Sequence, residues 1–213
     1  MGLNRPRKLT FEILSDTTFG GGTGLLVDTE IAHDELGLPV IPGKTIRGLL
    51  RCAWLSMKDV FNELEPAASR VLGESRGLDD GCILAIGDAG VDEQTKTWIQ
   101  WIVESERLFT SSLILDSITS TYTQTAVDRS TGAPLTASLR MTRTLAHGIA
   151  LEADLYWLDE PSDDDIRVLA LTALATRNVG LARNRGRGHV RVLLDGDLAA
   201  TRAAAGTDGG ENQ

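Results

Sequence analysis

The sequence has few of the residues on which disulfide-bonded, zinc-binding and membrane-spanning proteins depend. It contains two cysteines, Cys52 and Cys82, and three histidines in 213 residues. Two cysteines cannot build a disulfide framework, and the apolar neighbours of both predict buried thiols in a reducing compartment. The histidines are far apart and neither cysteine lies at a ligand spacing, which argues against a zinc site. No run approaches eighteen apolar residues, so we expect a cytoplasmic protein without a membrane span.

Basic residues are also scarce, and this argues at first against nucleic-acid binding. Lysine and arginine total 21 against 30 acidic residues, which gives a net charge of -9. The charge is uneven, however, because residues 59–106 hold eleven acids and three bases, whereas residues 43–58 and 181–194 each hold four bases and no acid. An acidic protein with two such basic segments can still bind a polyanion on one face. Both segments are equally compatible with ordinary solvated surfaces.

Several nucleotide-binding and catalytic motifs are missing. The stretch from Gly37 to Thr45 resembles a phosphate loop, but it has five residues between its glycines instead of four, and two of them are prolines. The Gly-rich residues 20–24 do not match a dinucleotide fingerprint, and no serine lies in a nucleophile elbow. A helix that begins at Lys44 would still offer free amides to a phosphate.

Hydrophobic periodicity predicts a strand–helix–strand, insertion, strand–helix–strand order. The predicted elements are strands at 9–13, 83–86, 149–157 and 190–194, a helix over 44–61, and a helix opened by Ser162 as N-cap. On the first helix, Lys44, Arg47, Arg51 and Lys58 form a basic stripe beside the apolar one. This order is the βαββαβ plan of an α+β, ferredoxin-like fold, which many RNA-binding modules share.

Two insertions and a tail are expected around this core, within a single domain of residues 1–198. Residues 62–110 form an acidic insertion, irregular up to about 80, with a helix over 92–108 that carries Trp98 and Trp101. Residues 118–146 are rich in Ser and Thr and predict a projecting hairpin with a turn at 128–132. The small, polar residues 199–213 predict a disordered tail.

The loop over residues 180–189 is the most informative segment. It joins a helix end to a strand and places Arg183, Arg185 and Arg187 between glycines. Glycine permits a close backbone approach, and arginine offers bidentate contacts to phosphate. The residues alone support a basic solvated turn as well as an RNA contact.

Taken together, five segments resemble the RAMP superfamily, specifically the repeated backbone subunit of type III CRISPR interference complexes. The resemblance extends from Leu9 to about Leu194. It is carried by the Gly-rich loop after the first strand, Val27-Asp28 with Asp34 six residues on, residues 38–43 leading into Ile46-Arg47-Gly48, residues 127–132, and the late Gly/Arg loop.

The resemblance implies a subunit that stacks with copies of itself along a CRISPR RNA, beside other type III subunits. A thumb-like hairpin at residues 122–141 would wedge into the duplex of guide and target RNA. Asp28 matches the residue that promotes target cleavage, with a divalent ion, Mg²⁺, as its metal and no organic cofactor. The implied RNA contacts are Lys44, Thr45, Arg47, Arg51, Arg129, Arg183, Arg185, Gly186, Arg187, Gly188 and His189.

A single carboxylate suffices for this chemistry because RNA contains its own nucleophile, the 2′-hydroxyl. Apolar Val27 and Ile31 would anchor the loop while Asp28 points outward, and Asp34 is expected to shape the loop. The alternative interpretation is that Asp28 is a surface carboxylate of a turn. Three other functions stay open: a RAMP subunit that only binds guide RNA, an enzyme that processes CRISPR RNA precursors with His33 as base, and a ferredoxin-like domain unrelated to RNA.

Overall fold

The computed structural model describes residues 4–24, 26–73, 81–106, 109–181 and 185–207 and confirms the ferredoxin-like α+β plan. A four-stranded antiparallel sheet has the strand order β4–β7–β1–β8. Its strands are β1 (Lys8–Ile13), β4 (Leu84–Ile86), β7 (Ala150–Trp157) and β8 (Val190–Leu194). The two central strands β1 and β7 pair with Phe11 opposite Leu151, and α1 (Gly43–Met57) and α5 (Asp163–Ala175) complete the βαββαβ order.

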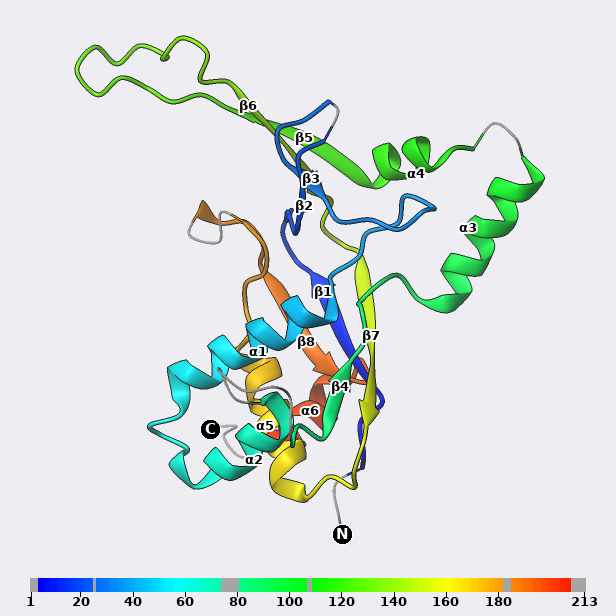
Figure 1. The fold of residues 1–213 in the computed structure, drawn as a ribbon, viewed down its shortest axis with the longest axis vertical. Coiled ribbons are helices and arrows are strands. Elements are labelled where there is room, and N and C mark those ends of the chain that lie inside the picture. The colour runs from blue at the N-terminus through cyan, green and yellow to red at the C-terminus, as the bar shows by residue number, and fades with distance from the viewer. Residues whose placement is uncertain (1–3, 25, 74–80, 107–108, 182–184, 208–213) are drawn as a thin grey trace, which may run out of the picture.

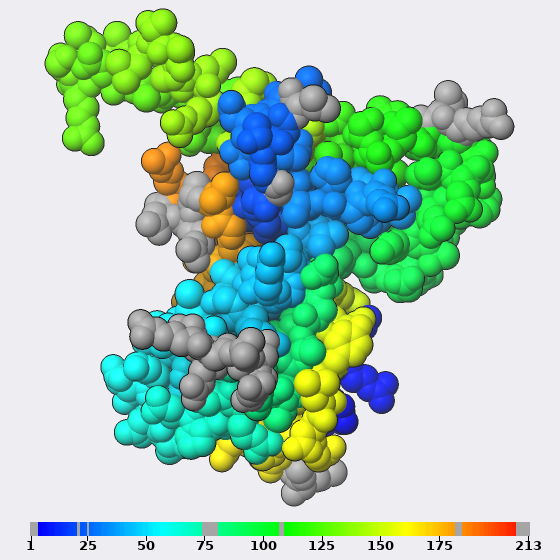
Figure 2. All heavy atoms as spheres, viewed as in Figure 1, coloured from blue at the N-terminus to red at the C-terminus, as the bar shows by residue number. Residues whose placement is uncertain are grey.

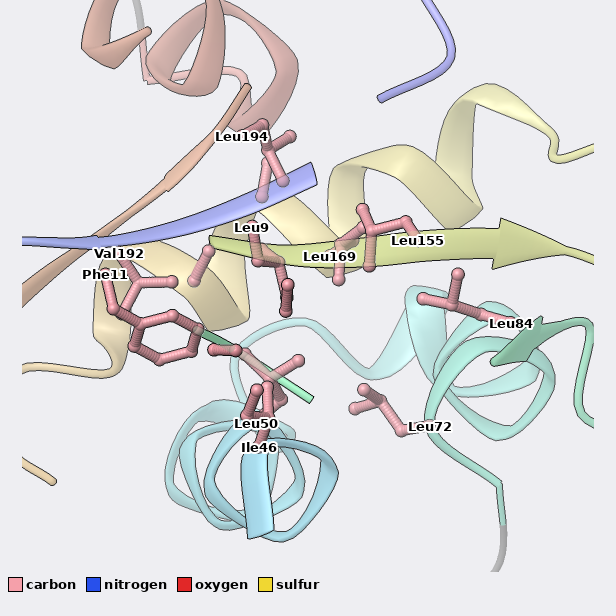
Figure 3. Close-up of a cluster of buried hydrophobic side chains, with 14 of the residues drawn as sticks. Leu9, Phe11, Ile46, Leu50, Leu72, Leu84, Leu155, Leu169, Val192 and Leu194 are labelled. Atoms are coloured by element: carbon pink, nitrogen blue, oxygen red, sulfur yellow. The ribbon is translucent and has the colours of Figure 1, made fainter. Parts of the chain in front are cut away.

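The core lies between one face of this sheet and its helices. Leu9, Phe11 and Ile13 alternate along β1 and are at most 1% exposed. Figure 3 shows Ile46 and Leu50 of α1 pointing toward Leu9 and Phe11. The alternating strand and the helical stripe predicted from the sequence therefore meet, as a two-layer core requires.

The acidic insertion contains a packed helix where an irregular segment was predicted. After a short 3₁₀ turn at Asn62–Leu64, α2 (Glu65–Leu72) buries Ala67, Ala68, Val71 and Leu72. The helix is tied to α5, because Arg70 lies 3.5 Å from the fully buried carboxylate of Asp165. The prediction failed since only one short apolar face marks this helix, among acidic residues. Ser162, in contrast, is the N-cap of α5, as predicted, and it also forms a capping box with Asp165.

Two helices, α3 (Glu93–Ser105) and α4 (Ser111–Ile118), follow β4 and extend away from the sheet (Figure 1). Asp92 caps α3, so the predicted helix is present, although its expected apolar member Leu108 lies outside the described residues. No residue of α3 is buried. Trp98 and Trp101 are 60% and 59% exposed and contact each other edge to face.

The predicted hairpin follows α4. Strands β5 (Thr119–Gln124) and β6 (Arg140–Leu145) pair from Thr119 opposite Leu145 to Gln124 opposite Arg140. Residues 125–139 continue beyond the strands as a long distal loop that projects from the body (Figures 1 and 2). Within it, Asp128 accepts hydrogen bonds from Ser130, and Gly132 adopts a φ of 69°, which confirms the predicted turn. We call residues 119–145 the thumb.

A helix follows β8, which corrects the prediction of a disordered tail from residue 199. Helix α6 (Leu198–Ala205) is capped by Asp197, whose side chain accepts from Ala200 N. Thr201 is fully buried and its hydroxyl accepts from Leu194 N at 2.9 Å. Alanine has the highest helix propensity, and its small side chain permits close packing, so this composition suits a docked helix. Residues 208–213 lie outside the described part.

Two further expectations concern thiols and membranes. Cys52 is exposed and Cys82 is half-buried, so the prediction that both thiols are buried is wrong for Cys52. The apolar residues around Cys52 belong to the opposite, inward face of α1. None of the helices in the described segments is long and apolar enough to cross a membrane.

Candidate nucleic-acid interface

Asp28 lies beside the outer end of the paired strands of the thumb, where Met141 is opposite Thr123. It belongs to the loop between β2 (Gly20–Gly22) and β3 (Glu30–Ile31), which is anchored by buried Val27 and Ile31. The side chain of Asp28 is exposed, as the apolar flanks predict. Its main chain and side chain both bind β6: Asp28 N donates to Met141 O at 2.8 Å, and Met141 N donates to Asp28 Oδ2 at 2.7 Å. The carboxylate is therefore fixed against the thumb while remaining open to solvent.

Asp34 has the structural role expected of it. Its Oδ1 accepts from Leu36 N and Leu38 N, both at 2.9 Å, and its own N donates to Leu38 O. Its other oxygen lies 3.7 Å from Nζ of Lys96. These bonds close the turn that leads to α1, and they use the carboxylate as a local acceptor.

A buried arginine that the sequence interpretation missed connects the Asp28 loop to the thumb. Arg143 of β6 is 9% exposed. Its Nε lies 2.8 Å from Glu30, and its Nη1 donates to Asp116 at 2.6 Å and to Thr119 Oγ1 at 2.9 Å. Burial lowers the pKa of Arg143, but the bond to Asp116 and the charge of Glu30 outweigh it and raise the pKa above its usual value. The alternation of Met141, Arg143 and Leu145 on β6 was the available signal for an inward arginine.

The late loop contacts the thumb directly. The guanidinium of Arg187 lies 3.6 Å from the ring centre of Tyr122 on β5, a cation–π contact. The loop approaches the chain closely at Gly188, whose N donates to Asp16 O and whose O accepts from Val179 N. A Cβ on Gly188 would lie 2.0 Å from Val179 O, so only glycine fits there. Arg183 lies outside the described residues.

A cleft lies between the late loop and the strands of the thumb, and Figure 2 shows the thumb extending beyond the loop. Its lining is polar and, among the residues that the structure describes, contains two arginines and no acid. The lining residues are Tyr122, Thr123, Gln124, Thr125, Ala126, Ala137, Ser138, Arg140 and Arg185. Arginine, hydroxyl and amide groups are the donors that bind nucleic-acid phosphates, so this cleft suits an RNA backbone. Arg140 was not among the predicted contacts.

The basic stripe predicted on α1 is only partly available to a ligand. Arg47 donates to Leu84 O at 2.6 Å and to Cys82 Sγ, and Arg51 donates to Leu72 O at 2.7 Å. These two arginines hold α1 to β4 and α2, a role that the stripe did not indicate. At the start of the helix Gly43 N donates to the carboxylate of Asp88 at 2.8 Å, so an anion of the protein already occupies that amide. Lys44 and Thr45 remain exposed beside it.

The remaining predicted contacts are on the surface. Arg129 is exposed in the distal loop of the thumb. His189 is exposed at the end of the late loop, where its N donates to Ser15 Oγ at 2.8 Å. Nearby, the carboxylate of Asp16 accepts hydrogen bonds from both N and Nδ1 of His147, the second at 2.9 Å. The bond to the His147 side chain lowers the pKa of Asp16. The structure thus brings Arg185 and Arg187 to the thumb and leaves Arg129 at its distal part.

Comparison with known proteins gives a consistent result. The sequence model of the RAMP superfamily matches residues 10–191. A chain of the type III-B Cmr-beta cryo-EM structure in the apo state is similar with a TM-score of 0.65, 13% identity, and coverage of 90% of this chain and 98% of that chain. A chain of type III-B Cmr-beta bound to cognate target RNA is similar with a TM-score of 0.62 and 12% identity, and the match covers 90% of this chain and 98% of that chain. Curated protein sequences give no match.

Proposed function

The chain belongs to the RAMP superfamily, and from this premise we propose that it is an RNA-binding backbone subunit of a type III CRISPR effector complex. In this proposal copies of the chain stack along a CRISPR RNA with other subunits. Together the copies cleave the target RNA that pairs with the guide, at regular intervals along it. The similarity in fold to chains of type III-B Cmr-beta supports the assignment to this kind of complex.

The observation that carries the cleavage proposal is the position of Asp28. Its exposed carboxylate is attached to β6 by the bond from Met141 N, so it stands beside the outer end of the paired strands, close to where the distal loop begins. A thumb inserted into a guide–target duplex would interrupt the duplex at this point. The backbone of the target RNA would then lie against Asp28. The polar cleft with Arg140 and Arg185 lies on the same hairpin and can hold phosphates.

Asp28 can act on a nucleophile that the substrate supplies. The 2′-oxygen of the target attacks the adjacent phosphorus, the bond from phosphorus to the 5′-oxygen breaks, and a 2′,3′-cyclic phosphate remains. Asp28 would orient the 2′-hydroxyl or accept its proton, and solvent would return a proton to the leaving 5′-oxygen. No organic cofactor is required for this step.

The residues around Asp28 fit a metal ion held mainly by substrate. One carboxylate oxygen accepts from Met141 N, and the described residues include no group of three or more His, Cys, Asp or Glu able to hold an ion. Mg²⁺ is commonly bound through one or two carboxylates together with phosphates and waters. A bound Mg²⁺ would stabilise the charge that develops on the phosphate, and Asp28 is the one residue we assign to it.

The experiment compares complexes assembled with guide RNA and companion subunits. Asp28→Asn can keep the bond from Met141 N but lacks the charge, whereas Asp28→Ala loses both. We expect guide and target binding to persist in both variants, and cleavage to fall by at least about 10²-fold, the usual loss for a positioned acid–base group. Asp34→Asn, which keeps an acceptor for Leu36 N and Leu38 N, is the matched control and should cut normally.

Chemical controls identify the reaction. Chelator should stop cleavage, a 2′-deoxy sugar at the cut position should resist it, and the 5′ fragments should end in a cyclic phosphate. If both Asp28 variants cut at the wild-type rate, the chain is a guide-binding subunit without a catalytic role. A stand-alone processing enzyme would instead cut precursor hairpins and require His33, whose Nδ1 lies 2.9 Å from Asp34 O.

A further inference from the structure

The side chain of Arg143 joins three elements around the proposed site. Its guanidinium contacts Glu30 of β3, Asp116 of α4 and Thr119 at the start of β5. Burial of a charge is costly unless every partner is in place, and removal of one partner leaves the others unpaired. The contacts around Arg143 therefore hold only when the Asp28 loop, α4 and the thumb are in their observed arrangement.

The same strand also carries the backbone contact of Asp28. Arg143 N donates to Thr29 O at 2.9 Å, and Met141, two residues earlier, binds Asp28 through both its N and its O. The short segment 28–30 is thus fixed to β6 at three successive residues, by the main chain at Asp28 and Thr29 and by the Glu30 side chain at Arg143. A movement of the thumb relative to this segment would break the ion pair with Glu30.

We propose that Arg143 is a positioning residue that couples the thumb to the Asp28 loop, so that insertion of the thumb into RNA places Asp28 against the target backbone. The inference rests on the proposed function, because it assumes that Asp28 acts in cleavage. Arg143 itself points into the protein and does not contact RNA. Its role is to transmit the orientation of the hairpin to the carboxylate.

The test uses three variants and one control in the assembled complex. Arg143→Met removes the charge, Arg143→Lys keeps it but cannot reach both carboxylates, and Asp116→Ala removes the more exposed partner while Glu30 remains paired. Arg5→Met is the control, since Arg5 forms an arginine–carboxylate contact with Glu160 near the N-terminus, at the far end of the sheet from the thumb (Figure 1). Target affinity and the single-turnover cleavage rate are measured separately for each.

We expect target affinity to stay within about twofold, while the cleavage rate of Arg143→Met falls by about 10²-fold, the loss that a 1 Å misplacement can cause. Arg143→Lys should recover part of the rate, and Asp116→Ala should lose less than Arg143→Met. Hydrogen exchange at the amides of Thr29 and Met141 should become faster in Arg143→Met and unchanged in Arg5→Met. Should Arg143→Met not fold, Arg143→Lys and Asp116→Ala decide the question by the same two measurements.

The outcomes separate this inference from the proposed function. Arg143 variants that cut at the wild-type rate, in a complex that Asp28→Ala inactivates, overturn the positioning role alone. An equal loss of affinity and rate also overturns it, since that pattern indicates general destabilisation. If Asp28→Ala leaves cleavage intact, the proposed function fails, and unchanged exchange at Thr29 and Met141 would then reject the coupling independently.

Discussion

Two glycines of the late loop offer a matched pair of substitutions, Gly186→Ala and Gly188→Ala. Both residues adopt a positive φ, 74° and 71° respectively. A left-handed conformation costs a residue with a Cβ roughly 1–2 kcal/mol, so both variants should be destabilised by this amount. They differ in space, because a Cβ at position 186 meets nothing within 4 Å, whereas at 188 it lies 2.0 Å from Val179 O.

The clash at position 188 cannot be relieved by moving a side chain. Val179 O belongs to the backbone, and Val179 N donates to Gly188 O at 2.8 Å. Moving the backbone at residue 179 away from residue 188 therefore breaks that bond. The second bond of the same bridge, from Val190 N to Arg177 O at 2.9 Å, would be lost as well. With about 1 kcal/mol for each broken hydrogen bond, Gly188→Ala should cost about 3–4 kcal/mol in total.

The assay is urea unfolding of the two variants, followed by guide-RNA binding at several salt concentrations. Gly188→Ala should unfold at a clearly lower urea concentration than Gly186→Ala. It should also bind guide RNA more weakly, because the loop that presents Arg185 and Arg187 has to move. Equal midpoints and equal affinities for the two variants would refute the argument that close packing at Gly188 positions this loop.

Three other predictions concern RNA binding, assembly and pH. Replacing Arg183, Arg185 and Arg187 together should weaken guide binding for all sequences. The plot of log affinity against log salt concentration should become shallower by about 0.7 for each phosphate that the variant no longer neutralises. If the variant binds like the wild type at moderate salt, the RNA face is elsewhere. With guide RNA and companion subunits the chain should form an elongated particle with several copies per guide, and a single copy in native mass spectrometry would contradict the backbone role. The bond from His147 lowers the pKa of Asp16, so this carboxylate stabilises the fold above its unfolded pKa near 3.8 and loses that effect as the pH falls through its lower folded value. Asp16→Asn should therefore lower the urea midpoint at pH 7, and its difference from the wild type should shrink as the pH falls below about 3.8.

Local periodicity was sufficient to predict the ferredoxin-like core. The alternation of Leu9, Phe11 and Ile13 and the apolar stripe of α1 are properties of short windows, and both features are present. Helix α2 was missed because its apolar face is short and lies among acidic residues, and α6 was missed because its apolar residues are mostly small alanines. Helix α2 is held by a partner that is remote in sequence, because Arg70 lies on Asp165 of α5, whereas Thr201 holds α6 to Leu194 at the end of β8.

The candidate site was less predictable because its contacts join distant residues. The spacing of arginines on α1 suggested a solvent-facing stripe, but Arg47 and Arg51 reach the carbonyls of Leu84 and Leu72. Nothing in a helical wheel indicates where such carbonyls lie. Arg143 and Glu30 are separated by more than a hundred residues, and they meet only because the loop after β1 packs on the thumb.

The acidic net charge is compatible with RNA binding because the charges are divided between two sides of the molecule. A second cleft, next to α3, is lined by two lysines and six acidic residues, namely Asp34, Asp88, Asp92, Glu93, Asp154 and Glu152. Figure 1 places α3 and the late loop on opposite sides of β1. Interactions between exposed charges are largely screened beyond about 8 Å at physiological salt. The acidic side therefore adds little repulsion at the thumb cleft, where Arg140 and Arg185 face no acid in the lining. The net charge of the chain predicts its average field, whereas RNA affinity depends on the charges within one screening length of the thumb.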